Sequence, residues 1–142
     1  MTVWFHAQTD AYAELSNFAP FGVEMDGAWW RTVEHAFQAA KFEDAAHRER
    51  IRAAHRPKDA KALGLSRSVP IRAEWDDVRT EVMRDLVHAK FATHDRPRAV
   101  LLGTGDEEIV ESTHDLFWGG GPDGSGANWL GRILMDVREA LR

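Results

Sequence analysis

The chain of 142 residues has the length of one domain, and its 44% hydrophobic and 29% charged residues are the balance of an ordinary globular protein. It contains no cysteine, which excludes disulfides, thiolate catalysis and cysteine-ligated zinc, and its formal net charge of −5 gives no overall match to DNA or RNA. No apolar run is long enough for a membrane span and the N-terminus has no signal-peptide pattern, so we expect a cytoplasmic protein.

Short strands and turns are predicted for the first 30 residues. Residues 3–6 have the composition of a strand. Residues 20–30 fit a β-hairpin whose two-residue turn is Asp26-Gly27, because these residue types accept the left-handed backbone that such turns require.

Three helices are predicted next. Thr32 is placed to cap a helix that runs to about Phe42, and Asp44 to cap a second that runs to about Ala54. A third short helix is expected over residues 57–64, opened by a proline and closed by a glycine.

The C-terminal half contains the strongest helical periodicity, over residues 76–94. Another short helix is expected from Pro97 to Gly103 or Gly105, and residues 107–112 fit either a strand or a helical turn. A last helix carries one apolar face formed by Leu130, Ile133, Leu134, Val137 and Leu141. The sequence therefore predicts a mainly α fold, a single helical domain over residues 1–142 with a small N-terminal β element, and α+β is the fallback class.

The helix over residues 32–42 carries an unusual polar stripe. It is apolar on nearly all sides, which predicts burial, yet Glu34, Gln38 and Lys41 form a narrow line along it. A buried acid and a buried amine are costly unless they are paired or used. Two interpretations remain open. The stripe is either a salt bridge that fixes the helix, or a catalytic pair in which Glu34, kept ionised by the helix dipole, holds a positive charge or activates water.

A glycine-rich segment precedes the last helix. Residues 119–131 hold six of the eleven glycines, and glycine lets the backbone approach a ligand closely. Asn128 or Ser125 can cap the helix, and Arg132 in its first turn would be stabilised by a phosphate bound at the helix N-terminus. The alternative is a flexible loop that leads into a capped helix.

Other polar and aromatic residues allow two interpretations each. Trp75, directly before the long helix, is either a core anchor or a surface on which a base or sugar stacks. Lys61, Arg67 and Arg72 flank a loop and either meet a phosphate or are simply solvated. The seven histidines show no metal-ligand spacing, so most are expected on solvated faces and no metal is assigned.

A series of short motifs runs through nearly the whole chain at regular positions. The motifs are Leu15-Ser16-Asn17-Phe18, Asp26-Gly27, residues 30–42, residues 71–75, Val82-Met83, Lys90-Phe91, residues 101–105, Glu111, Asp115, Trp118-Gly119, Gly124, Gly126, Asn128, Leu130-Gly131 and residues 134–138. Together they resemble the NADAR superfamily, which includes the YbiA-like riboflavin-intermediate N-glycosidases. Three departures lie beside the expected pocket, where this family commonly has a proline at Arg31 and aromatic residues at Leu15 and Ala36.

The resemblance implies a mainly helical domain without metal or cofactor. Similar members hydrolyse the ribosylamine bond of early riboflavin-pathway intermediates and release ribose 5-phosphate. The resemblance implies that Glu34 and Lys41 are catalytic. The substrate-binding residues that we assign on this basis are Asn17, Phe18, Arg31, Gln38, Trp75, Asp115, Trp118, Gly119, Asn128 and Arg132.

A mechanism follows for this substrate. Cleavage of a ribose–nitrogen bond builds positive charge on the sugar carbon, which an ionised Glu34 would stabilise. A neutral Lys41, its pKa lowered by burial, could attack the ring-opened sugar and form a Schiff base. Trp75 and Trp118 would enclose the base, and the glycine-rich segment with Arg132 would hold the phosphate.

Two rival functions are kept. The first is an ADP-ribosyl-guanine hydrolase that acts on ADP-ribosylated nucleic acid, although the net charge of −5 disfavours a strand-binding channel. The second is a non-enzymatic module that binds ADP-ribose or NAD. The expected partner is a small ribosyl compound, with no membrane.

Overall fold

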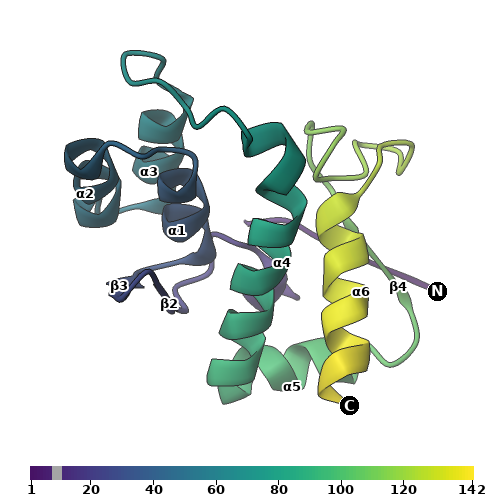
Figure 1. Ribbon diagram of the computed structural model, residues 1–142. Helices are drawn as coiled ribbons and strands as arrows, with labels where there is room; N and C mark the ends of the chain where they lie inside the picture. The colour runs from purple at the N-terminus through teal and green to yellow at the C-terminus, as the bar shows by residue number, and fades with distance from the viewer. Residues whose placement is uncertain (8–10) are drawn as a thin grey trace.

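The computed structural model describes residues 1–7 and 11–142 of the chain (Figure 1). In these residues it contains six α-helices, four short strands and one 3-10 turn, which confirms the mainly α prediction rather than its α+β fallback. In chain order the elements are β1 (Thr2–Phe5), η1 (Ala13–Leu15), β2 (Val23–Met25), β3 (Ala28–Trp30), α1 (Val33–Ala40), α2 (Ala45–Ala53), α3 (Pro57–Leu65), α4 (Trp75–Thr93), α5 (Asp95–Gly103), β4 (Glu108–Glu111) and α6 (Trp129–Leu141).

The predicted hairpin is confirmed. Strands β2 and β3 pair antiparallel, with Val23 opposite Trp30 and Met25 opposite Ala28. The two turn residues Asp26 and Gly27 have φ angles of 53° and 78°. Both therefore lie in the left-handed region that a tight hairpin turn needs, which is why this pair of residue types marks the turn in the sequence.

A second sheet joins two distant parts of the chain. Strand β1 pairs in parallel with β4, with Thr2 opposite Glu108 and Phe5 opposite Glu111. The ambiguous residues 107–112 thus form a strand because β1 supplies its backbone partners, and the predicted N-terminal strand lies one residue earlier than expected. A parallel pair requires a long crossover, and here most of the helices lie within it.

The predicted caps of the N-terminal helices are confirmed. Thr32 accepts a hydrogen bond from the backbone N–H of His35 at 3.1 Å, and Asp44 accepts one from His47 at 2.9 Å. Helix α1 ends at Ala40, two residues earlier than expected, because Phe42 makes a β-bridge with Ile71 instead.

Three helix boundaries differ from the predictions. Helix α3 continues one residue past Gly64, and α4 begins at Trp75 instead of after it. Helix α5 begins at Asp95 rather than Pro97. Proline is tolerated as the third residue of α5 because the first-turn N–H groups have no partner within a helix.

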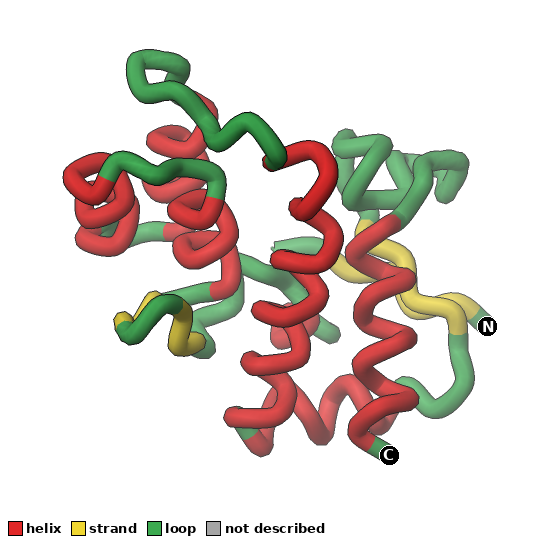
Figure 2. The backbone as a smooth tube through the Cα atoms, viewed as in Figure 1, coloured by secondary structure: helices red, strands yellow, loops and turns green. Residues whose placement is uncertain are grey.

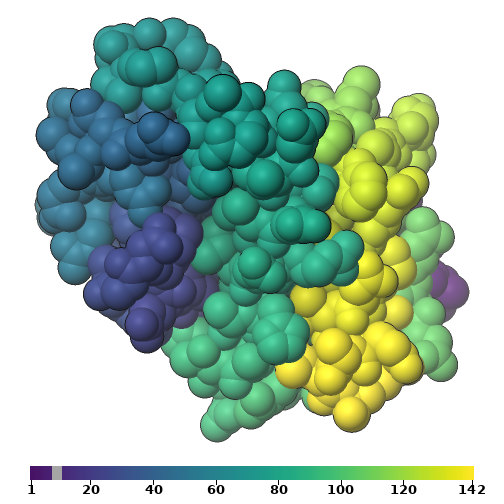
Figure 3. Space-filling model, in the orientation of Figure 1, coloured from purple at the N-terminus to yellow at the C-terminus, as the bar shows by residue number. Residues whose placement is uncertain are grey.

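Helix α4 runs through the middle of the molecule (Figure 1). Helices α1, α2 and α3 lie on one side of it, and α6 with β4 lies on the other. In the space-filling view the teal-green α4 separates the blue part of the chain from the yellow part, and the purple N-terminal end lies beside the yellow part (Figure 3). None of the described helices is long and apolar enough to cross a membrane.

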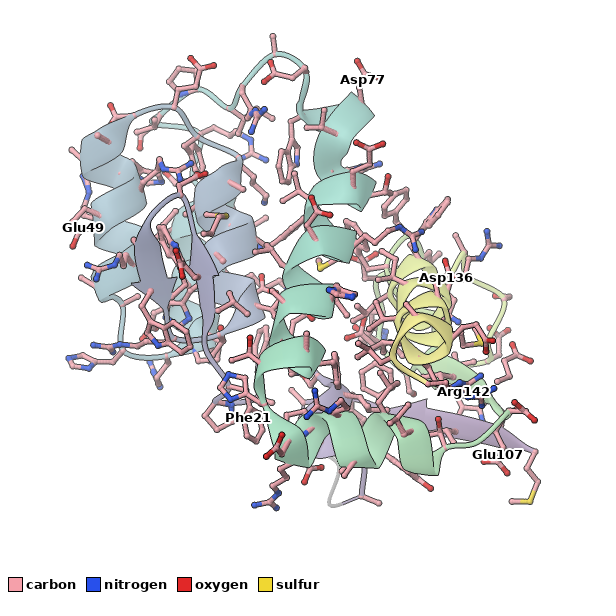
Figure 4. All side chains as sticks on the ribbon, turned by 60° about the horizontal axis from the view of Figure 1, so that its bottom comes forward. Phe21, Glu49, Asp77, Glu107, Asp136 and Arg142 are labelled. Carbon is pink, nitrogen blue, oxygen red and sulfur yellow. The ribbon has the colours of Figure 1, made fainter. Side chains whose placement is uncertain are left out.

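Charged side chains mark the outer faces of the helices. Glu49 projects from α2 and Asp136 from α6 (Figure 4), and their side chains are 63% and 60% exposed. Each forms an ion pair with an arginine, Glu49 with Arg52 and Asp136 with Arg84. Such exposed pairs contribute little to stability, typically below about 1 kcal/mol.

Two histidines are exceptions to the expectation that most histidines lie on solvated faces. His35 is fully buried, its ring nitrogens lying 2.8 Å from Thr32 Oγ1 and 2.9 Å from the carbonyl oxygen of Ala54. His47 is buried too, with its Nε2 3.0 Å from the carbonyl oxygen of Leu63. Both rings thus connect neighbouring helices, a role that the charged local sequence concealed. Among the described residues, no three histidines or carboxylates are grouped where a metal ion could bind.

Candidate active site

A cavity of about 810 Å³ opens between α1, α3, α4 and the segment that follows β4. The loops after α3 and after β4 both lie near the end at which α4 begins (Figure 2). Eight of the predicted site residues line this cavity, namely Asn17, Phe18, Glu34, Gln38, Lys41, Trp75, Asp115 and Trp118.

The polar stripe of α1 faces the cavity. All eight residues of α1 are buried, and Glu34 and Lys41 are each 8% exposed. Gln38 Nε2 donates to Glu34 Oε2 at 2.5 Å, whereas Lys41 Nζ lies 3.5 Å from the carbonyl oxygen of Gly64. In residues 1–7 and 11–142 no ion pair within 4.0 Å joins Glu34 to Lys41. The stripe is therefore not held together by a salt bridge between its ends.

Burial shifts both ends of the stripe toward their neutral forms. It raises the pKa of Glu34, and the hydrogen bond from Gln38 offsets part of this effect. The sequence had suggested the opposite direction, because the helix dipole alone favours the carboxylate. Burial also lowers the pKa of Lys41, offset in part by the charge of Glu34. Both groups can therefore exchange protons nearer to neutral pH than they would in water.

The turn that carries Asn17 is fixed from three sides. Its carbonyl accepts the N–H of Glu34 at 3.2 Å, and its side-chain amide donates to Met83 Sδ at 3.4 Å. The preceding carbonyl, of Ser16, accepts a hydrogen bond from Lys90 Nζ at 2.7 Å. Lys90 is fully buried, and burial lowers its pKa to about 7. This lysine thus holds the cavity wall from behind.

Three aromatic rings form one continuous wall. The ring of Phe37 lies 5.1 Å from the ring of Trp75 and 5.3 Å from that of Trp118, measured between centroids. Trp75 is only 5% exposed, so it serves the core as well as the cavity. Phe37 was not among the predicted site residues, although its ring contacts both predicted indoles.

Asp115 organises the turn that presents Trp118. Its Oδ1 accepts the backbone N–H groups of Phe117 and Trp118, both at 2.8 Å. A short acidic side chain that binds the next amides stabilises a tight turn. Asp115 therefore has a structural role in addition to its place on the cavity wall.

Glu111 lines the cavity but was absent from the predicted site. It is the last residue of β4, and its backbone N–H donates to Asn128 Oδ1 at 3.1 Å. Burial, together with the charges of Glu34 and Asp115, raises the pKa of Glu111 to about 7. The available signal was its place in the family motif, but with its secondary structure undecided nothing showed that it faces Glu34.

Four predicted binding residues lie outside the cavity lining. Arg31 points toward α2 and donates to the carbonyl of Ala54 at 3.1 Å. The Arg132 guanidinium lies 5.2 Å from the ring centre of Trp129. Asn128 is buried and donates to the carbonyl of Ile109 at 2.9 Å, and Gly119 is buried in the loop behind the cavity wall.

The glycine-rich segment uses its own backbone donors. At the start of α6, the N–H of Trp129 donates to the carbonyl of Phe117 at 3.0 Å, and that of Leu130 to the carbonyl of Trp118 at 2.9 Å. Asn128 has a left-handed backbone and its side chain does not cap the helix. Two of the amides that a phosphate would need at this helix N-terminus are thus already paired, which disfavours the predicted phosphate site here.

The chain is similar to known proteins in sequence and in fold. A family model described as the NADAR domain matches residues 4–142. The N-glycosidase Npun_R5314 of Nostoc punctiforme is 46% identical over an alignment of 146 positions, which covers 100% of this chain and 94% of that protein. The N-glycosidase YbiA of Escherichia coli is 44% identical over 138 residues, 96% of this chain and 86% of YbiA.

The fold is also similar to a solved structure. The NMR structure of E. coli YbiA matches with a TM-score of 0.89 at 43% identity, covering 99% of this chain and 84% of that one. A further relative, riboflavin biosynthesis protein VVA0006 of Vibrio vulnificus, is 41% identical over 143 residues. The match covers 99% of this chain but 38% of that protein.

Proposed function

The chain belongs to the NADAR domain family and is an N-glycosidase, and we propose that it hydrolyses the ribose–nitrogen bond of early riboflavin-pathway ribosylamino-pyrimidine phosphates, releasing ribose 5-phosphate. The observation that carries this proposal is the buried carboxylate Glu34 and the buried amine Lys41, unpaired with each other, on one cavity. The name of the Vibrio relative supports the choice of substrate.

The cavity has the dimensions and the wall that such a substrate needs. A volume of about 810 Å³ lies within the range of sites for small molecules. A pyrimidine would lie against the aromatic wall of Phe37, Trp75 and Trp118, where flat rings gain both buried area and favourable ring contacts.

Two carboxyl groups would divide the proton transfers. Burial raises the pKa of both Glu34 and Glu111. The hydrogen bond from Gln38 opposes this effect at Glu34 and favours its charged form, whereas two neighbouring carboxylates further favour the neutral form of Glu111. Glu111 would donate a proton to the leaving nitrogen as the carbon–nitrogen bond breaks. Glu34 would stabilise the developing positive charge and take a proton from the water that adds its oxygen to the sugar carbon.

Lys41 allows a second route to the same products. A ribosylamine opens its ring to an imine, and the neutral amine of Lys41 would attack that carbon and displace the base nitrogen. The resulting Schiff base would then be hydrolysed by water, which frees the sugar and restores the lysine. The lowered pKa of Lys41 favours the neutral amine that this route requires.

One assay separates this function from its rivals. The protein is incubated in turn with a ribosylamino-pyrimidine phosphate, with DNA carrying ADP-ribosylated guanine, and with free ADP-ribose, and products are identified by mass spectrometry. We expect ribose 5-phosphate and free pyrimidine from the first substrate at the highest kcat/KM. Faster release of ADP-ribose from guanine would replace the proposed substrate, and binding of ADP-ribose without any turnover would contradict the proposed reaction.

A further inference from the structure

Three cations lie at the cavity edge without a role in the chemistry above. Lys61 lies on α3, Arg67 follows α3 and Arg79 lies on α4, and all three line the cavity. Lys61 and Arg67 are exposed and Arg79 is half-buried, so the group spans the opening and the wall. In addition to burial, the positive charges of all three residues lower the pKa of Lys41. The three cations therefore lie around the Lys41 end of the stripe.

These three cations share one cavity, and none of them forms an ion pair with a described acidic side chain. Across the described part of the chain, no carboxylate lies within 4.0 Å of Lys61, Arg67 or Arg79, although Asp76 and Asp115 line the same cavity. Burial raises the pKa of Glu34 and of Glu111 and the charge of Lys61 opposes this effect, but no ion pair within residues 1–7 and 11–142 holds any of the three cations. A group of like charges without such pairs attracts an anion. The arginines that do pair with a carboxylate are Arg48, Arg52, Arg56, Arg72, Arg84, Arg96, Arg98 and Arg142.

A single carbonyl gathers two of the positive groups. Arg67 Nη1 donates to the carbonyl oxygen of Gly64 at 3.1 Å, and Lys41 Nζ lies 3.5 Å from the same oxygen. Gly64 lies in the last turn of α3, where free carbonyls carry the negative end of the helix dipole. The helix end therefore holds the cations in place without neutralising them. The other hydrogen bond of Arg67, to the carbonyl of Ser66, also uses Nη1, so Nε and Nη2 can serve a ligand.

Arg79 is held flat by an aromatic ring. Its guanidinium carbon lies 3.8 Å from the ring centre of Phe117. Its Nε is buried, and no hydrogen-bond partner for it exists among the residues that the structure describes. Stacking fixes the plane of the guanidinium, and a planar fork of N–H donors matches the oxygens of a phosphate.

We propose that Lys61, Arg67 and Arg79 form a phosphate-binding subsite at the cavity opening, which selects ribosyl compounds that carry a 5′-phosphate. The inference rests on the proposed function for its substrate class and replaces the glycine-rich segment as the place where the phosphate binds. The paired donors of that segment and the unpaired cations here point to the same assignment.

Equilibrium binding of ribose 5-phosphate and of ribose, measured by calorimetry, tests the subsite without any need for turnover. The test variant is Lys61→Gln/Arg79→Gln. The matched control is Lys58→Gln/Arg50→Gln, which removes the same two charges from exposed residues of α3 and α2 that lie outside the cavity. We expect the wild type to bind ribose 5-phosphate at least about tenfold more tightly than ribose, and the test variant to lose roughly tenfold or more. The control should stay within about twofold.

The variant Arg79→Lys keeps the charge but removes the planar fork, and should lose affinity while the circular dichroism spectrum is unchanged. Equal wild-type affinities for ribose and ribose 5-phosphate would overturn the proposal, as would unchanged binding by the test variant. Titration with inorganic phosphate and with ADP-ribose then shows whether the subsite takes a single phosphate or a diphosphate.

Turnover separates failure of the subsite from failure of the proposed function. With one ribosylamine prepared with and without its 5′-phosphate, the test variant should raise KM for the phosphorylated form only. Any change in kcat that results from the altered pKa of Lys41 should be the same for both forms. If the phosphate makes no difference to the wild type, the subsite is wrong and the hydrolase activity stands. If no ribosylamine is cleaved while binding still depends on Lys61 and Arg79, the subsite stands and the proposed reaction falls.

Discussion

The polar stripe of α1 and the glycine-rich segment before α6 were both expected from the sequence to meet the substrate. The structure treats them in opposite ways. Glu34 and Lys41 line the cavity without an ion pair between them, whereas Asn128 binds β4 and the amides at the start of α6 donate to nearby carbonyls. This difference shows that polar groups with satisfied hydrogen bonds stabilise the scaffold, whereas polar groups without such partners in a cavity are available for chemistry.

Two buried lysines repeat this contrast. Burial lowers the pKa of both Lys41 and Lys90. Lys90 donates to the carbonyl of Ser16 at 2.7 Å and lies outside the cavity lining, whereas Lys41 lines the cavity and has only a long contact of 3.5 Å to a carbonyl. A lowered pKa is common to both lysines and therefore does not identify the functional one. Access to the cavity does, because only Lys41 lines it.

The largest expected effect comes from the stripe itself. Glu34→Gln and Lys41→Met should each lower kcat/KM by roughly 10³-fold, because each removes a group that would act only in the transition state. Borohydride added during turnover should attach the sugar to Lys41 if the imine route operates. Thermal melting should show a folded protein in both variants.

The control for the stripe is Arg31→Gln, which alters an exposed side chain close to α1 but outside the cavity. It should keep near wild-type activity. If both stripe variants retained more than half of the wild-type activity, Glu34 and Lys41 would not be catalytic, and the stripe would be part of the scaffold.

The next effect concerns Glu111. As a proton donor it must be protonated, and its pKa is raised to about 7, so kcat/KM should fall as the pH rises through about 7. Glu111→Gln should lower activity by about 10²-fold and abolish this alkaline limb. Glu108→Gln, an exposed carboxylate on the same strand, should leave the limb in place. An unchanged pH profile in Glu111→Gln would assign the proton to another group.

A scaffold residue should affect stability more than chemistry. Asn128→Ala leaves the carbonyl of Ile109 and the N–H of Glu111 without their side-chain partner, which should cost about 2–4 kcal/mol of unfolding free energy. Arg132→Ala removes only a contact with the Trp129 ring and should cost less than about 1 kcal/mol. Urea denaturation measures both, and similar values for the two would contradict the scaffold role of Asn128.

The smallest predicted effect tests how α3 supports the stripe. A methyl group at Gly64 would collide with the side chain of Gln38, so Gly64→Ala should destabilise the protein by about 1–3 kcal/mol. It should also lower activity, because Gln38 would no longer reach Glu34. Gly103→Ala has open space around it and should be neutral or slightly stabilising. Unchanged kinetics in Gly64→Ala would show that the Gln38 contact does not matter for catalysis.

Local sequence was sufficient for features that depend on neighbouring residues alone. Thr32 and Asp44 cap the helices that follow them, and Asp26-Gly27 closes the hairpin. The stripe of Glu34, Gln38 and Lys41 was identified for the same reason, since helical spacing puts these side chains on one line whatever packs around them.

Features that depend on a distant partner were missed or left open. Residues 107–112 could not be assigned because the parallel partner β1 lies a hundred residues away in the chain. Glu111 was therefore not placed opposite Glu34. His35 and His47 were expected on solvated faces because their neighbours are charged, but the packing of α1 and α2 buries both rings.

The sequence by itself determined the helices, the caps of α1 and α2, the hairpin and the acid–amine stripe, because these follow from backbone preferences and periodicity within a few residues. Only the tertiary structure decided which polar groups remain unpaired in the cavity. Hydrogen bonds and burial arise between segments that are far apart in the chain. For this reason the polar side chains of Asn128 and Lys90 hold the scaffold together, whereas those of Glu111 and Arg79 line the cavity.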